Sequence, residues 1–247
     1  LIKVTIGDSV TGIGGNAFGD CRSLLSVTIG ENVKIIEDGA FFYCPKLVEI
    51  VNKSNLSMIP SCFGENIKYV KVIENGESGI VNKNGYLFCE KDNADYLLGY
   101  AGNDTDLVLP EDFNGQSYKI YKYAFKDCKN LTSITIPNCV TDIGDFAFQD
   151  CVSLSVVTIG NGVTNIGAYA FYGCNSLSVV TIGNGVTNIE EYAFYDCNSL
   201  LSVTIGNGVT NIKERAFSGC SSLKRVVIPD SVTSIEEYAF RGCRSLS

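Results

Sequence analysis

The sequence predicts an α/β repeat protein, a right-handed solenoid of 23-residue coils with parallel strands on its concave face and short helical turns on its convex face. Three observations support this fold class. Cysteines recur every 23 residues, an Ala-Phe pair recurs eight times with the same register, and the spacing of apolar residues changes inside each period. A fixed period of this length is the sequence signature of a stacked repeat fold.

The cysteines define the period. They fall 23 residues apart in two runs, at Cys21 and Cys44 and then at Cys128, Cys151, Cys174, Cys197, Cys220 and Cys243. Such regular spacing indicates a repeat rather than a disulfide framework, and we expect these cysteines to be small buried apolar side chains. Cys62, Cys89 and Cys139 lie off this ladder, and Cys89 is expected to be the most exposed thiol.

Each coil contains two kinds of segment. In residues 177–182, LSVVTI, apolar and polar positions alternate as in a strand. Residues 183–185, Gly-Asn-Gly, are expected to turn the chain because Gly and Asn tolerate positive φ. From Ala193 to Leu200 the apolar residues fall at i, i+1, i+4 and i+7, which predicts a short helix or 3₁₀ turn.

A single coil buries too little apolar surface to be stable alone, so neighbouring coils must stack on one another. The strands of successive coils would then pair in parallel. Stacking also predicts that Phe171, Phe194 and Phe217 line up along one axis of the solenoid.

The consensus A-F-x-x-C-x-x-L-x-x-V-x-I, with variants at Ile136-Pro137 and Ile228-Pro229, resembles the BspA-like leucine-rich-repeat family. The resemblance covers residues 1–63 and 107–247. It implies a leucine-rich-repeat solenoid. Known members are mostly cell-surface or secreted proteins of bacteria and some protists, and several are implicated in adhesion to host proteins or other microbes. The resemblance therefore implies an extracellular or cell-surface location and a binding role.

The repeat is interrupted in the middle of the chain. We expect one continuous solenoid domain with regular coils at 1–63 and 121–247, and a degenerate coil carrying a β-hairpin at 64–120. After Ile59 the register fails, and Cys62-Phe63 replaces Ala-Phe. Asn84-Gly85, between two apolar runs, is a strong hairpin signal. Further strands and another turn are expected at 96–98, 107–109 and 114–115. Insertions in solenoids are often functional, although a tolerated surface loop is the simpler interpretation.

The composition argues against catalysis. The chain contains no histidine, which excludes Ser-His-Asp and Cys-His sites, HExxH metalloproteases and most zinc sites. Glu190-Glu191 and Glu236-Glu237 recur at one coil position, but a glycosidase pair would need a cleft. We expect no catalytic residue, no metal ligand and no cofactor. A net charge of −8 argues against nucleic acid, and no apolar run is long enough for membrane insertion.

Two surfaces are candidates for binding. The first comprises outward strand positions on the concave face, at Thr135, Thr158, Thr181, Thr204, Val156, Val179, Ser202 and Arg225. Ordered hydroxyl rows can bind protein, glycan or ice, yet β-branched residues are also what exposed strand positions prefer. The second is an aromatic flank beside the Ala-Phe pair, at Tyr123, Tyr169, Tyr192, Tyr172 and Tyr195. Such rings can contact a glycan or protein, and stacking between coils is the simpler alternative.

These observations predict a non-enzymatic cell-surface or secreted adhesion module that engages an extracellular protein or glycan. One alternative is a structural spacer within a longer surface protein. Another is self-association through uncapped ends, because Leu1 and Leu246 occupy the same point of the coil and neither end carries a polar capping repeat.

Overall fold

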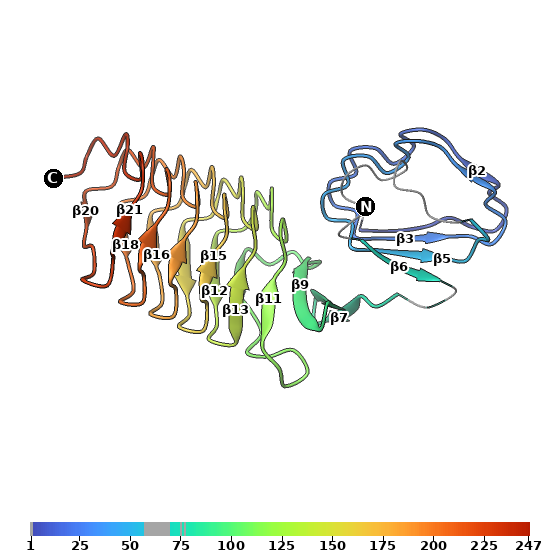
Figure 1. Ribbon diagram of the computed structural model, residues 1–247, viewed down its shortest axis with the longest axis horizontal. Helices are drawn as coiled ribbons and strands as arrows, with labels where there is room; N and C mark the ends of the chain where they lie inside the picture. The colour runs from blue at the N-terminus through green and yellow to red at the C-terminus, as the bar shows by residue number, and fades with distance from the viewer. Residues whose placement is uncertain (1, 57–69, 75, 77) are drawn as a thin grey trace. The chain divides into compact units, whose positions relative to one another are not determined.

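The computed structural model describes residues 2–56, 70–74, 76 and 78–247. The chain divides into two compact units, Leu1–Ile80 and Val81–Ser247. Both are β-solenoids of stacked coils joined by turns, and the described residues contain no helix (Figure 1). The predicted break at Cys62-Phe63 lies outside the described residues.

The first unit contains two parallel sheets. The larger has the strand order β1 (Lys3–Thr5), β3 (Ser26–Ile29), β5 (Glu49–Asn52) and β6 (Lys71–Glu74). The smaller pairs β2 (Gly12–Ile13) with β4 (Ile35–Ile36). Val27 lies opposite Val4 on one side and Ile50 on the other. Each of these steps is one 23-residue coil, so the repeat sets the strand register.

The second unit has a parallel sheet of six strands, one from each coil. Its order is β10 (Asp106–Val108), β12 (Ser133–Ile136), β14 (Val156–Ile159), β16 (Val179–Thr181), β18 (Ser202–Thr204) and β20 (Arg225–Val226). Val180 is buried between exposed Val179 and Thr181. This alternation matches the strand pattern that the sequence predicts.

A nine-stranded sheet covers another side of the same coils. Its parallel part is β11 (Tyr118–Ile120), β13 (Val140–Ile143), β15 (Asn165–Ile166), β17 (Asn188–Ile189), β19 (Asn211–Ile212) and β21 (Ser234–Ile235). The remaining strands are β9 (Ala94–Tyr100), β8 (Tyr86–Lys91) and β7 (Val81–Lys83). Because β9 pairs in parallel with β11, the insertion extends the solenoid sheet.

The hairpin prediction is confirmed. Strands β7 and β8 are antiparallel, and Asn84 and Gly85 between them have φ of 53° and 88°. Positive φ at both central residues is the requirement of a type I′ turn. The expectation for Cys89 was wrong, since its side chain is only 6% exposed. Cys89 lies in β8, which is covered by β7 on one edge and β9 on the other.

The predicted helical turns on the convex side are wrong. The amide of Phe194 donates to Ala216 of the next coil, whereas that of Tyr195 donates to Tyr192 of its own coil. This alternation repeats along the segment, so every second amide is used between coils. A helix needs an unbroken series of i→i−4 bonds, which this pattern removes. Positive φ at Tyr192 and Asp196 also breaks any helical run.

The phenylalanines form the axis that the repeat predicts. Phe171 and Phe194 stack with ring centroids 5.0 Å apart, and Phe194 and Phe217 follow at 5.1 Å. Five ladder cysteines are buried as thiols, as expected, namely Cys44, Cys151, Cys174, Cys197 and Cys220, whereas Cys21, Cys128 and Cys243 are only partly buried. The Sγ of Cys197 donates to the carbonyl of Phe171, 3.2 Å away in the preceding coil. Each buried thiol therefore fills a small space and also links two coils.

The glycines of the Gly-Asn-Gly turn have a different role from the one expected. Neither Gly183 nor Gly185 has positive φ. A Cβ at Gly185 would lie 1.9 Å from the carbonyl oxygen of Asn161, and one at Gly183 would lie 2.5 Å from that of Gly160. Close approach of adjacent coils requires these glycines.

Candidate functional site

The predicted strand-face residues lie together on the exposed side of the six-stranded sheet, which we call the sheet face. Thr135, Thr158, Thr181 and Thr204 form one column in direct register. Ser133, Val156, Val179, Ser202 and Arg225 form the second. Val156 and Val179 expose 41% and 39% of their surface. The structure thus brings the predicted residues into one continuous array.

Charge is confined to the two ends of the sheet face. Asp106 extends the second column at β10, and Arg225 ends it at β20. Asp106 accepts hydrogen bonds from the hydroxyls of Ser133 at 2.7 Å and Thr132 at 2.8 Å. These bonds, with Ser133 contributing most, lower the pKa of the Asp106 carboxyl. The central positions of the face are uncharged.

Val108 extends the threonine column and was not among the residues predicted from the sequence. It lies opposite Thr135 and is 66% exposed. The alternation of Leu107, Val108 and Leu109 was the available signal, because the two leucines are buried and Val108 must therefore point outward.

The tyrosine flank is a continuous aromatic stack. Ring centroids are 5.0 Å apart from Tyr123 to Phe146, 4.9 Å from Phe146 to Tyr169, and 4.7 Å from Tyr169 to Tyr192. The guanidinium of Arg215 then lies over the Tyr192 ring at 5.5 Å. Both faces of the Tyr169 ring are thus covered by neighbouring rings, which leaves edges and hydroxyls for a ligand.

Tyr172 and Tyr195 form a second, shorter stack beside the first. Their centroids are 5.4 Å apart, and Tyr195 also contacts Tyr192 at 5.3 Å in a tilted arrangement. Burial raises the pKa of Tyr172, with nearby carboxylates adding to the effect. All five predicted tyrosines therefore belong to inter-coil stacks, and their half-buried rings lie together.

The backbone of the main stack adopts an uncommon conformation. Tyr123, Tyr169, Tyr192 and Arg215 have φ of 62°, 58°, 56° and 53°. Bulky residues rarely occupy this left-handed region, where each costs on the order of 1–2 kcal/mol. Stacking of an aromatic pair returns about 0.5–1.5 kcal/mol. The stack therefore offsets the backbone strain that its own residues create.

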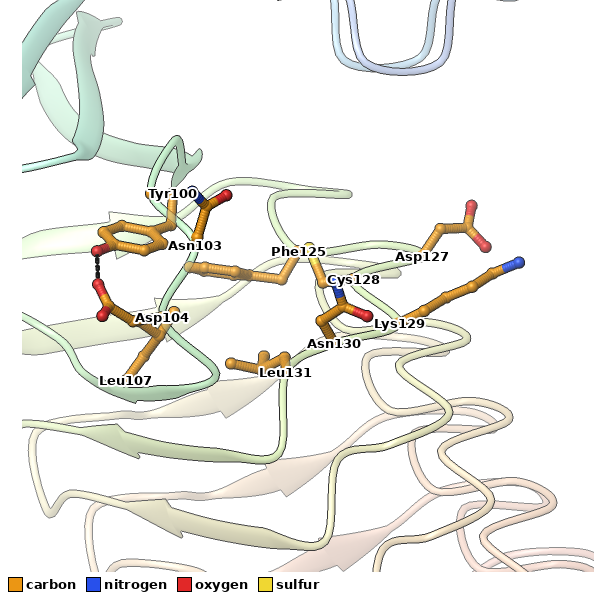
Figure 2. Close-up of a pocket in the computed structure, with 11 residues that line it drawn as sticks. Tyr100, Asn103, Asp104, Leu107, Phe125, Asp127, Cys128, Lys129, Asn130 and Leu131 are labelled. Atoms are coloured by element: carbon orange, nitrogen blue, oxygen red, sulfur yellow. Dashed lines mark hydrogen bonds between the residues drawn. The ribbon is translucent and has the colours of Figure 1, made fainter.

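A pocket of about 370 Å³ opens where the insertion meets the first regular coil of the second unit. Tyr100 and Asp104 lie on one side and Asn130 on the other, with Phe125 between them (Figure 2). The Tyr100 hydroxyl donates to the Asp104 carboxylate. No sequence pattern indicated this pocket, because its two halves lie apart along the chain and join only where stacking is interrupted.

The described residues contain no group of three or more His, Cys, Asp or Glu side chains that could hold a metal ion. Burial raises the pKa of Cys174 and raises that of Cys197 well above the pKa of an ordinary thiol. Such thiols stay protonated and are poor nucleophiles. The part of the chain that the structure describes also has no helix that could cross a membrane.

Stacked parallel-strand coils define a leucine-rich-repeat solenoid. A family model of the BspA type leucine rich repeat region matches residues 1–91 and 118–247 in six copies. The chain therefore belongs to the BspA-type leucine-rich-repeat family.

Solved structures of two bacterial proteins have a similar fold. A leucine rich cell surface protein of Faecalibacterium prausnitzii A2-165 is 24% identical, with 96% of this chain and 79% of that chain covered and a TM-score of 0.57. A leucine-rich repeat protein of Eubacterium ventriosum ATCC 27560 is 21% identical, with 98% and 76% covered and a TM-score of 0.55. Among curated proteins there is no match. These similarities establish the fold.

Proposed function

We propose that this protein is a non-enzymatic binding or adhesion module, secreted or held at the cell surface, which engages a protein or glycan through the sheet face. The observation that carries the proposal is the two-column array of exposed Thr, Val and Ser side chains, uncharged through its centre. A partner can bury such an array without leaving charges unpaired.

The sheet face is better suited than the aromatic stack to be the main contact. The Tyr169 ring has neighbours on both faces, 4.9 Å and 4.7 Å away, so a sugar ring cannot stack on it without displacing one. Threonine instead presents a methyl group and a hydroxyl at each step of the column. The tyrosine edges and hydroxyls then serve as a secondary contact for the same or a larger partner.

Family membership supports the proposed location. Members of the BspA-like family are mostly secreted or surface proteins, and one solved structure of the same fold is described as a cell surface protein. The acidic chain, with 27 Asp and Glu against 19 Lys and Arg, favours protein or neutral glycan over nucleic acid as the partner.

A binding screen against extracellular-matrix proteins and a glycan array tests the proposal. Once a ligand is found, the double variant Val179→Lys, Thr181→Lys places two charges at the centre of the sheet face and should weaken binding at least tenfold. Ser199→Lys adds the same kind of charge at an exposed turn and should leave binding unchanged. A second arm changes Tyr169 and Tyr192 to Ala, and we expect a smaller loss.

If the chain is instead a structural spacer, the opposite result is expected, and the chain will bind nothing in the screen. Binding that survives both the sheet-face variant and the tyrosine variant would equally contradict the proposed surface, even where the adhesive role holds.

A further inference from the structure

We propose that the pocket between residues 100–107 and 125–131 binds a neutral saccharide residue. This site is separate from the sheet face, and all of its lining residues belong to the second unit. It gives the insertion a role that a tolerated surface loop would lack.

The pocket lies where the insertion takes the place of one regular coil. In the regular coils, the turn before each strand is covered by its neighbours; the amide of Asp127 donates to Gln149 and the Sγ of Cys151 donates to Phe125. On its other side, the 125–131 segment faces the loop that leads from β9 to β10. This loop is anchored by the Thr132 amide, which donates to the carbonyl of Thr105. The space that a stacked coil would fill remains as the pocket.

The base of the pocket is apolar and rigid. Leu107, Phe125 and Leu131 expose only 5%, 1% and 4% of their surface. Phe125 is held from behind by Phe148, whose ring stacks at 5.0 Å. These side chains close the floor of the pocket and present little area to a ligand, so the exposed walls must provide most of the contact with a sugar.

The walls present groups that suit hydroxyls. Asn103 and Asn130 are exposed, and within the described part of the chain neither side-chain amide has a hydrogen-bond partner. An amide both donates and accepts, as a sugar hydroxyl does. Asp104 adds a carboxylate acceptor, and the bond from Tyr100 fixes its position (Figure 2). Opposite walls can therefore contact different hydroxyls of one ring.

Charge and size select the ligand class. The lining contains two carboxylates, Asp104 and Asp127, and one ammonium, Lys129. Asp127 and Lys129 both point away from the centre, which leaves Asp104 as the charged group beside it (Figure 2). An anionic sugar would meet net negative charge, whereas a neutral sugar carries no charge to be repelled. A volume of about 370 Å³ is near the lower end of the range for small-molecule pockets and suits one or two rings.

Saturation-transfer NMR on the intact chain tests the inference. The probes are galactose, N-acetylglucosamine, glucose and lactose, with N-acetylneuraminic acid as the anionic arm. We expect a signal for at least one neutral sugar and none for the acid. The double variant Asn103→Ala, Asn130→Ala should weaken binding at least tenfold, because it removes exposed amides from both walls.

The matched control is Ser176→Ala, which changes the residue that occupies the coil position of Asn130 two coils further on. It should bind as the unchanged protein does. The sheet-face variant Val179→Lys, Thr181→Lys should also bind sugar normally, so the pocket and the proposed function fail independently. Absence of any neutral-sugar signal, a stronger signal from the acid, or full binding by the amide variant would each overturn the inference.

Discussion

The two units use the same left-handed backbone position but fill it with different side chains. In the first unit, the residue before Ala-Phe is Asn16 or Gly39, with φ of 56° and 72°. In the second unit this position carries Tyr, Phe or Arg with similar φ. Asn and Gly enter this region readily, whereas the larger residues do not. The comparison shows that the coil's hydrogen-bonding pattern sets the backbone, while packing between coils selects the side chain.

The row of stacked phenylalanine rings, which we call the phenylalanine ladder, also differs between the two units. The first unit has one described stacked pair, Phe18 and Phe41, with centroids 5.1 Å apart, and Phe18 is only partly buried. In the second unit the rings from Phe125 to Phe240 stack without a break. An interior ring there has two neighbours and is fully buried, so its removal should cost more.

The largest expected effect is that of Phe194→Ala. The variant removes a fully buried ring from the middle of the ladder and should lower the free energy of unfolding by about 3–5 kcal/mol. Phe18→Ala should cost less, because Phe18 is partly exposed and has one described ring partner. Urea denaturation followed by circular dichroism measures both. Equal losses would refute the idea that ladder position sets the cost.

Glycine substitutions test the close approach of stacked coils, which both units share, since a Cβ at Gly30 of the first unit would lie 2.6 Å from the carbonyl oxygen of Ile6. Gly183→Ala would place a Cβ 2.5 Å from the carbonyl of Gly160, so the coils must separate locally, and we expect a loss of about 1–3 kcal/mol. Gly7 occupies the same coil position in the first unit, but a Cβ there would meet no other atom within 4 Å. Gly7→Ala should therefore be nearly neutral in the same denaturation experiment. A measurable loss at both positions would point to backbone conformation as the cause.

Much of the fold could be predicted because one signal was repeated in every coil. The period determined the strand register, the Phe ladder and the burial of the cysteines. The helical turns were predicted wrongly because apolar spacing alone cannot show where amides donate. The alternate use of amides by Phe194 and Tyr195 depends on the neighbouring coil, which is present only in the stacked state.

The candidate site also has parts that the sequence predicted and parts that it did not. The outward Thr and Val columns were predictable, since alternation along a strand determines which side chains face solvent. Arg215 was not predicted as part of the aromatic stack, because it is not aromatic and enters through its guanidinium. The pocket depends on how the 100–107 loop meets the first regular coil, and no local pattern encodes that contact.

The buried thiols make stability depend on pH. Burial raises the pKa of Cys197 well above its ordinary value of 9.0, so the unfolded chain loses this proton first as the pH rises. The stabilising contribution of this buried thiol is fully present below about pH 8 and declines above about pH 9, by roughly 1 kcal/mol at about pH 10. Denaturation of the unchanged protein and Cys197→Ala at about pH 7.5 and pH 10 should show a stability difference that shrinks at the higher pH.

Ser199→Ala provides the control for this pH dependence, because it changes an exposed hydroxyl that does not titrate. Its stability difference from the unchanged protein should be the same at both pH values. A Cys197→Ala difference that stays constant between the two pH values would show that the thiol ionises as readily in the folded coil as in the unfolded chain.

The smallest expected change in stability tests the backbone strain at Tyr169 directly. Tyr169→Ala and Tyr169→Gly both remove the ring and its stacking, so both should be less stable than the unchanged protein. They differ in the cost of a φ of 58° at this position. Alanine incurs the left-handed penalty and glycine does not, so the Gly variant should be more stable than the Ala variant by about 1 kcal/mol.

This expected order of stability is the reverse of the usual one, in which glycine destabilises an ordered segment relative to alanine. The matched pair in the first unit is Asn16→Ala and Asn16→Gly, where φ is 56° and no ring is lost. The Gly variant should again be the more stable, by a similar amount, because the same coil geometry sets φ in both units. A preference for alanine at Tyr169 but for glycine at Asn16 would mean that the second unit relaxes once its stack is broken. The left-handed backbone would then follow from the aromatic side chains rather than from the coil.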